Sequence, residues 1–225
     1  MKNIFELISK NWWEKTGPCK PLHTLNTIRF NFIKKHTKIN KKNILDIGCG
    51  AGILSEKLSL HGGMVTGIDI SKKLINIAQQ HSQKNKLQIN YQHSNIENFI
   101  KKNDKKFDIL ICTEVLEHLN NPEILIKLCK KANHEKSDIF LSSLNKNIIT
   151  YINIILLGEF ISKKLKKNTH NYNKFISIHN LKNILNKEKL YIKNIKGLIY
   201  NPILNYAKIS NNYNINYLIH ITNNE

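Results

Sequence analysis

The feature that most constrains the fold of this chain is the segment Asp46-Ile47-Gly48-Cys49-Gly50-Ala51-Gly52. An apolar run at residues 43–47 leads into it, and a helical pattern at residues 53–60 follows it. Glycine allows a tight turn and lets the backbone approach a bound molecule closely, as the strand–loop–helix units of open α/β sheets require. The segment therefore predicts a ligand site across the carboxyl ends of parallel strands.

Apolar runs and helical patterns alternate along the rest of the chain. This alternation predicts an α/β, Rossmann-like fold, with a seven-stranded, mostly parallel sheet and helices on both faces. Helices are expected after Ser71, after Asn121 and at residues 179–187. Further strands are expected at residues 64–70, 87–92, 107–112, 138–143, 190–199 and 214–221.

The length and composition fit one globular domain spanning residues 1–225. Within it we expect a helical N-terminal segment at residues 1–40 and a helical insertion near residues 148–175, where the sequence changes character. No apolar run approaches the ~20 residues that span a bilayer, and no signal peptide is evident. The four cysteines lack the spacing of a zinc or disulfide framework, which suits a reducing cytosol. The sequence therefore predicts a cytoplasmic location.

The formal net charge of +19, from 35 basic and 16 acidic residues, has two explanations that the sequence leaves open. It attracts an anionic partner, or it reflects a general enrichment in lysine alongside asparagine and isoleucine. A nucleic-acid groove would interleave aromatic with basic side chains. That pattern is not found, so no nucleic-acid partner is expected. Arg29 is the only arginine, which suggests a position that needs a planar bidentate donor.

Two acidic residues indicate the kind of ligand. Asp46 stands two residues before the first glycine of the loop, and Asp69 closes the next strand. A carboxylate at the start of the loop would repel a pyrophosphate, whereas it suits a cationic ligand with an amino-acid tail. The carboxylate of Asp69 is placed to accept hydrogen bonds from both hydroxyls of an adenosine ribose.

These motifs resemble those of class I S-adenosylmethionine-dependent methyltransferases. A closer resemblance, to the ubiquinone-biosynthesis O-methyltransferases, extends from Trp12 to His220. That family acts on 2-polyprenyl-6-hydroxyphenol and on 3-demethylubiquinol. The resemblance rests on residues 12–14, 20–23, 26, 29, 45–52, 65–69, 93–97, 107–112, 114–118, 158–160, 169–175, 197–205 and 216–220.

The resemblance implies S-adenosylmethionine as methyl donor and the phenolic hydroxyls of a polyprenylated phenol or quinol as acceptors. It also implies contact with other enzymes of ubiquinone biosynthesis. Donor-binding roles fall on Arg29, Gly48, Asp69 and Thr113, together with the loop residues Asp46 and Gly50.

The acceptor chemistry needs a group that favours the ionised phenol. A phenol of pKa about 10 is rarely ionised at pH 7, which costs roughly 4 kcal/mol. A general base or a divalent metal could offset most of that cost. If residues 114–118 are helical, Glu114, Glu117 and His118 share one face and could hold Mg²⁺ or a similar ion, or shape the pocket without metal. His23 and His170 are weaker candidates for the base.

One segment departs from the class pattern, and another suggests membrane contact. Residues 133–137 replace the usual Pro-Gly-Gly turn, so a looser loop is expected there. Residues 148–167 combine an apolar stretch with four lysines, which is typical of reversible docking on an anionic membrane, although a core helix with a basic end would look the same.

Two other functions remain as alternatives. The basic charge would also suit an RNA or protein methyltransferase, and the loop alone would suit a non-catalytic adenosyl-binding module. The second is disfavoured because both the donor side and the acceptor side of the site are represented in the sequence.

Overall fold

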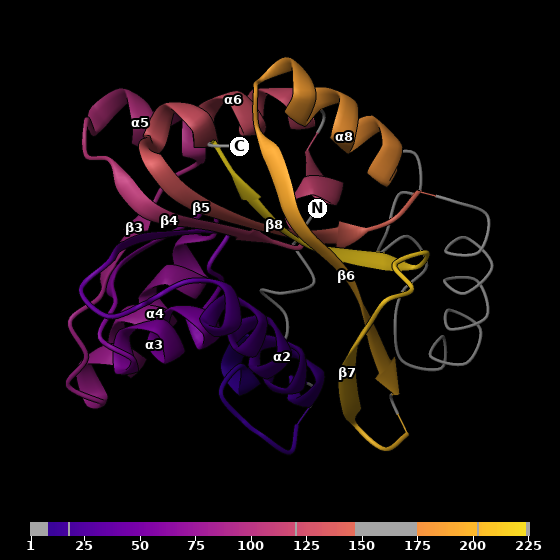
Figure 1. The fold of residues 1–225 in the computed structure, drawn as a ribbon. Coiled ribbons are helices and arrows are strands. Elements are labelled where there is room, and N and C mark those ends of the chain that lie inside the picture. The colour runs from indigo at the N-terminus through magenta and orange to yellow at the C-terminus, as the bar shows by residue number, and fades with distance from the viewer. Residues whose placement is uncertain (1–8, 18, 120, 147–174, 202, 224–225) are drawn as a thin grey trace.

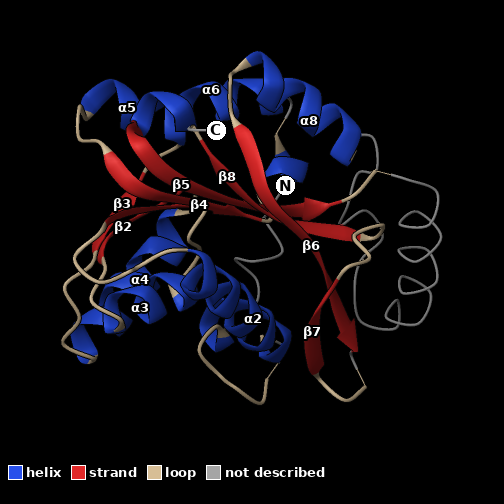
Figure 2. Cartoon of the chain, in the orientation of Figure 1, coloured by secondary structure: helices blue, strands red, loops and turns tan. Residues whose placement is uncertain are grey.

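The computed structural model describes residues 9–17, 19–119, 121–146, 175–201 and 203–223. These residues form an eight-stranded mixed sheet with helices on both faces (Figures 1 and 2). The strand order is β3-β2-β1-β4-β5-β8-β6-β7. The first five strands of that order are parallel, whereas β8, β6 and β7 pair antiparallel.

The strands are β1 (Asn43–Ile47), β2 (Met64–Asp69), β3 (Asn90–His93), β4 (Phe107–Thr113), β5 (Asn133–Leu144), β6 (Tyr191–Asn201), β7 (Tyr206–Ser210) and β8 (Asn216–Thr222). The α-helices are α2 (Lys20–His36), α3 (Ile53–Leu60), α4 (Lys72–Lys84), α5 (Ile96–Lys102), α6 (Pro122–Ala132) and α8 (Ile178–Lys187). Two short 3₁₀ turns are η1 (Ser9–Asn11) and η2 (Leu116–His118).

The helices begin where the sequence provides caps. The hydroxyl of Ser71 accepts a hydrogen bond from the backbone N–H of Leu74 at the start of α4. The side chain of Asn121 accepts one from Glu123 at the start of α6, and Pro122 occupies the first helical position. These caps satisfy N–H groups that have no partner inside the helix.

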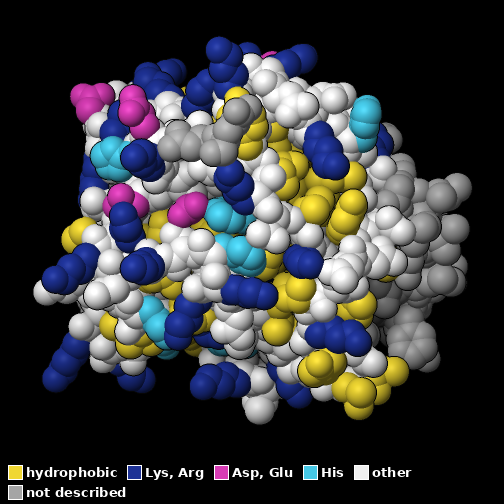
Figure 3. All heavy atoms as spheres, viewed as in Figure 1, with side chains coloured by type: hydrophobic (Ala, Val, Ile, Leu, Met, Phe, Trp, Pro, Cys, Tyr) yellow, Lys and Arg dark blue, Asp and Glu magenta, His cyan; other side chains and the backbone are white. Residues whose placement is uncertain are grey.

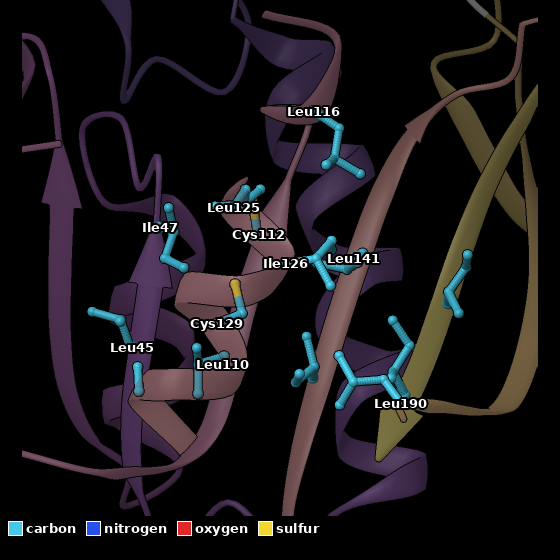
Figure 4. Packing of buried hydrophobic residues seen from close by; sticks show 14 of the residues in the cluster. Leu45, Ile47, Leu110, Cys112, Leu116, Leu125, Ile126, Cys129, Leu141 and Leu190 are labelled. Atoms are coloured by element: carbon cyan, nitrogen blue, oxygen red, sulfur yellow. The ribbon is translucent and has the colours of Figure 1, made fainter. Parts of the chain in front are cut away.

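The central strands are buried on both faces, because side chains alternate between the two helical layers. Leu45 of β1 and Leu110 of β4 face the layer of α5, α6 and α8, where Figure 4 shows them near Cys129 of α6. Ile44 belongs to the second cluster, with side chains of α2 and α3. The two layers lie on opposite sides of the sheet in Figure 1.

The predicted fold class is confirmed, with one additional strand. β6 extends to Asn201, and the chain returns as β7, which pairs with β6. The looser loop expected at residues 133–137 is confirmed in part. The segment lies within the bounds of β5, but the register against β4 shifts between Phe107 and Ile109, and residues 134–137 form no strand pairing with other described residues. These extra residues therefore form an irregularity near the start of β5 of the kind that a bulge produces.

The insertion predicted near residues 148–175 lies outside the described residues except for the buried Phe175. None of the helices in the described part of the chain is long and apolar enough to cross a membrane.

Candidate active site

The glycine loop lies at the carboxyl ends of β1 and β2, as the sequence predicts. The backbone N–H of Gly48 donates to the carbonyl of Ile68 at 2.8 Å. The N–H of Gly50 donates to Oδ2 of Asp69 at 2.9 Å. The loop therefore curls from the end of β1 onto the end of β2.

At two positions of the loop, the backbone conformation and the lack of room for a Cβ atom both require glycine. Gly48 has φ of +72° and Gly52 has φ of +92°, in the left-handed region that favours glycine. A Cβ on Gly48 would lie 2.4 Å from Cγ2 of Val115, and one on Gly52 would lie 2.2 Å from Oη of Tyr91. The loop is therefore closely packed from two sides by other segments.

Asp46 stands behind the loop rather than in front of it. Its side chain is buried and accepts a hydrogen bond of 2.5 Å from the hydroxyl of Ser55 in α3. Burial raises the pKa of Asp46 to about 6. The hydrogen bond connects the last part of β1 to the helix that follows the loop, so Asp46 orders the loop from within.

The carboxylate of Asp69 is held by two backbone donors. Oδ2 accepts from Gly50, and Oδ1 accepts from the N–H of Ser71 at 2.8 Å. Burial is the main cause that raises the pKa of this carboxyl above its ordinary value. An ionised carboxylate has about four lone-pair sites, so the two used here leave acceptor capacity for hydroxyl groups of a ligand.

Arg29 links α2 to the end of β4. Its Nη2 lies 2.8 Å from Oε1 of Glu114, and its Nη1 donates to Oδ1 of Asn26 at 3.4 Å. The side chain is buried, and its Nε has no hydrogen-bond partner. A buried guanidinium with an unused donor is suited to an additional anionic group.

Glu114 follows Thr113, the last residue of β4, in a strained backbone conformation. Its φ is +57°, which is uncommon for a residue other than glycine and is typical of functional sites. Its N–H donates to the carbonyl of Ser142 in β5 at 3.0 Å, and the hydroxyl of Ser142 donates to its Oε1 at 2.8 Å. These contacts place a carboxylate, about one-third exposed, beside the guanidinium of Arg29.

Glu117 lies behind Glu114 and is buried. The hydroxyl of Ser143 donates to its Oε2 at 2.8 Å. Burial, followed by the charge of Glu114, raises the pKa of Glu117 to about 8, and a hydrogen bond between the two side chains favours the protonated form. The two residues therefore form a carboxyl pair that retains a proton at neutral pH.

The predicted metal site at Glu114, Glu117 and His118 does not form. In the described part of the chain, no three His, Cys, Asp or Glu side chains are grouped so that they could hold a metal ion. The expectation assumed an α-helix over residues 114–118. Instead, the backbone of Glu114 has a left-handed conformation, and only Leu116–His118 form a 3₁₀ turn. That turn buries Glu117 and leaves His118 exposed, so the three side chains do not share a face.

The N-terminal segment covers the glycine loop. Trp12 is buried, and its ring lies against Gly50, where a Cβ would be 2.8 Å from its Cζ2. Trp13 stacks on His81 of α4 with ring centroids 3.5 Å apart. Nε2 of His23 lies 3.0 Å from the carbonyl oxygen of Trp12, so this histidine attaches α2 to the N-terminal segment.

His170 lies outside the described residues. The serines that position the carboxyl pair were not predicted from the sequence. Their positions depend on the pairing of Thr113 with Ser142 across β4 and β5, and no local pattern signals that pairing.

Glu117→Gln is expected to stabilise the protein at alkaline pH. A carboxyl with a raised folded pKa contributes stability that is fully present below its unfolded pKa and is lost as pH rises through the folded value. The window for Glu117 runs from about 4.3 to about 8. The variant's advantage in unfolding free energy should therefore grow by about 1.4 kcal/mol per pH unit across that window and level off above it.

Urea unfolding of both proteins at pH values between about 5 and 9 measures this difference. Glu97→Gln, at an exposed position of α5, controls for the loss of one surface charge. A difference between wild type and Glu117→Gln that does not change with pH would contradict a protonated, buried Glu117.

Comparisons with known proteins bear on this site. Residues 38–207 match a family model described as a methyltransferase domain. The chain is 39% identical over 224 residues to the ubiquinone biosynthesis O-methyltransferase of Glaesserella parasuis. This alignment covers 97% of this chain and 95% of that protein. It is 36% identical over 214 residues to the protein of the same name from Coxiella burnetii. That alignment covers 95% of this chain and 91% of the relative.

The fold also resembles that of a solved structure. Magnesium protoporphyrin IX methyltransferase from Synechocystis PCC 6803, with bound SAH, has a TM-score of 0.74 to this chain. The identity is 16%, and the comparison covers 99% of this chain and 95% of that chain. At this identity, the likeness concerns the fold alone.

Proposed function

The chain belongs to the family of ubiquinone biosynthesis O-methyltransferases, and from that premise we propose that its site transfers the methyl group of S-adenosylmethionine to polyprenylated phenols. The acceptors are the phenolic hydroxyls of 2-polyprenyl-6-hydroxyphenol and 3-demethylubiquinol. One observation carries the proposal. The buried guanidinium of Arg29 pairs with Glu114 at 2.8 Å, and its charge also opposes the rise that burial causes in the pKa of Asp46 at the start of the glycine loop, so it joins a donor side to an acceptor side.

The donor side fits S-adenosylmethionine, which supplies a methyl group activated on a sulfonium. The remaining lone pairs of Asp69 accept the ribose hydroxyls, and the glycine loop that carries Gly48 and Gly50 is held against the end of β2 beside this carboxylate. The unpartnered Nε of Arg29 is a donor for the carboxylate of the amino-acid tail. Thr113 ends β4 next to Glu114, at the border between the two sides.

The carboxyl pair supplies the base on the acceptor side. Glu114 is the more exposed member and receives the phenol proton, and Glu117 sets how basic the pair is. Transfer from a phenol of pKa about 10 to a carboxylate of pKa about 4.3 is uphill by roughly 8 kcal/mol. Transfer to the fully ionised pair, which binds its first proton near pH 8, is uphill by only about 3 kcal/mol, so the pair acts as base in the form from which Glu117 has lost its proton. The transfer to the carboxyl pair needs no divalent metal ion, and Glu114, Glu117 and His118 are not arranged to hold one.

The test offers labelled S-adenosylmethionine to the protein with each polyprenylated phenol, with tRNA, with a protein substrate mixture, or alone. We expect label on the phenolic oxygen of the two quinone precursors and nowhere else. Label on tRNA or protein would instead favour an RNA or protein methyltransferase. Binding of the donor without transfer to any acceptor would favour an adenosyl-binding module. Contacts with an anionic membrane and with other enzymes of the pathway are part of the same proposal.

A further inference from the structure

The β6–β7 hairpin carries a group of exposed apolar side chains. Of the ten large hydrophobic residues that are exposed in the described part of the chain, five lie within residues 199–209. The two at the turn are the most exposed, Ile203 at 81% and Leu204 at 74%. We call the group Ile199, Ile203, Leu204 and Tyr206 the hairpin tip. Figure 3 shows hydrophobic side chains gathered at this end of the molecule, at the lower right.

Two backbone donors at the turn of the hairpin tip are already satisfied. The side-chain oxygen of Asn201 accepts hydrogen bonds from the N–H groups of Ile203 and Leu204, at 2.9 and 3.0 Å. Unpaired backbone donors prevent a turn from entering an apolar medium, because each costs several kcal/mol there. With these two donors paired internally, the side chains of Ile203 and Leu204 can enter hydrocarbon at a lower cost.

The hairpin tip is also fixed to the helix that carries Arg29. Asn205 accepts a hydrogen bond from the hydroxyl of Tyr200 at 3.0 Å and donates one of 2.8 Å to the hydroxyl of Thr24 in α2. Thr24 precedes Arg29 by five residues, or about 7.5 Å along the helix axis. A surface that engages the tip is therefore held close to the acceptor side of the site.

The β6–β7 hairpin carries charge of one sign. Residues 191–210 contain three lysines and no acidic residue, and the exposed Lys208 pairs with Ile199 across the hairpin. The sequence of α2, which packs against β7, likewise has basic residues and no acidic one. Apolar side chains among lysines, with tyrosine at the border, are typical of surfaces that lie at the interface of an anionic bilayer.

We propose that the hairpin tip docks the protein on an anionic lipid bilayer, with Ile203 and Leu204 entering the interfacial layer. The proposal rests on the proposed function, because a polyprenylated acceptor resides in the bilayer and must be reached there. It is separate from the contact predicted for residues 148–167, which lie outside the described residues.

The test compares vesicle binding by wild type and by Ile203→Asp/Leu204→Asp. The vesicles contain about three parts phosphatidylcholine to one part phosphatidylglycerol, and phosphatidylcholine alone serves as the neutral comparison. Leu60→Asp/Ile124→Asp is the matched control, because it makes the same changes at two exposed apolar positions on other elements. The binding constant for anionic vesicles should fall by about tenfold or more in the tip variant and by less than about twofold in the control.

A second measurement uses a tryptophan placed in the hairpin tip, whose fluorescence should change when the tip enters the bilayer. The fluorescence of Leu204→Trp should shift to the blue on addition of anionic vesicles, whereas that of Leu60→Trp, at a similarly exposed position, should not. This measurement stands even if the double aspartate variant does not fold. Absence of the shift, or equal vesicle binding by the tip variant and wild type, would overturn the proposal. Dissociation of a wild-type dimer by the tip variant would also overturn it, because a second copy would then cover the tip.

Methylation of a short-chain, water-soluble phenol distinguishes this proposal from the proposed function. We expect the tip variant to retain wild-type activity on that acceptor, since none of its changed residues contacts the site. If wild type binds vesicles through the tip but does not methylate the short-chain phenol, the proposed function fails and the docking surface stands. If it methylates the phenol without binding vesicles, the docking surface fails.

Discussion

Asp69→Ala is expected to abolish measurable binding of S-adenosylmethionine and to lower kcat/KM by about 10²–10⁴-fold. The substitution removes the acceptors for two ribose hydroxyls, and each hydrogen bond to a charged group contributes roughly 1.5–3 kcal/mol. It also frees the N–H of Gly50, which Oδ2 of Asp69 now holds at 2.9 Å, so the loop loses its attachment to β2. Calorimetric titration with S-adenosylmethionine and with S-adenosylhomocysteine measures the loss.

Asp104→Ala is the matched control, since Asp104 is exposed in the loop between α5 and β4. It should bind both ligands as wild type does. Asp69→Asn keeps one acceptor oxygen and should bind with intermediate affinity, which separates loss of the ribose contact from a collapsed loop. Wild-type affinity in Asp69→Ala would contradict the placement of the donor across the glycine loop.

Glu114→Gln is expected to lower kcat by about 10²–10⁴-fold, the range that a general base contributes. The amide still accepts hydrogen bonds from Arg29 and Ser142, so the local structure should be preserved. The affinity for S-adenosylmethionine should stay the same or increase, because the negative charge that now occupies Arg29 is removed. A fall in kcat with an unchanged dissociation constant of the donor therefore separates the acceptor role of Glu114 from a donor-binding role.

Glu123→Gln, at the start of α6, is the control for this measurement, because Glu123 is a similarly half-buried carboxylate that is paired with a different residue, Lys127. In wild type, kcat/KM should rise with pH through about 8, as Glu117 loses its proton and the pair becomes more basic. If donor affinity in Glu114→Gln fell in parallel with kcat, the residue would be a donor ligand and not the base.

Local motifs predicted the structure around the glycine loop well. The bounds expected for the strand and helix around the glycine loop agree with Asn43–Ile47 and Ile53–Leu60. Asp69 closes β2 as expected. These features depend on residues close together in sequence, where glycine and a capping serine act through the backbone of their own segment.

The acceptor side was predicted less well, because it depends on contacts between distant segments. The sequence marks Arg29 as a single arginine and Glu114 as an acidic residue after a strand, but not the ion pair between them. The left-handed conformation of Glu114 replaced the expected helix and with it the expected metal ligands. Helix α5 was also missed, although its capping residue Asn95 was a local signal.

An experimental structure of the protein with S-adenosylhomocysteine and a short-chain 2-prenyl-6-hydroxyphenol tests the assignment of the two sides most directly. We expect the ribose hydroxyls to lie within about 2.6–3.2 Å of the Asp69 carboxylate and the acceptor oxygen to lie at a similar distance from Glu114. Arg29 should contact the carboxylate of S-adenosylhomocysteine while it keeps its ion pair with Glu114. An acceptor bound away from the Glu114–Glu117 pair, or a donor bound away from the glycine loop, would contradict this assignment.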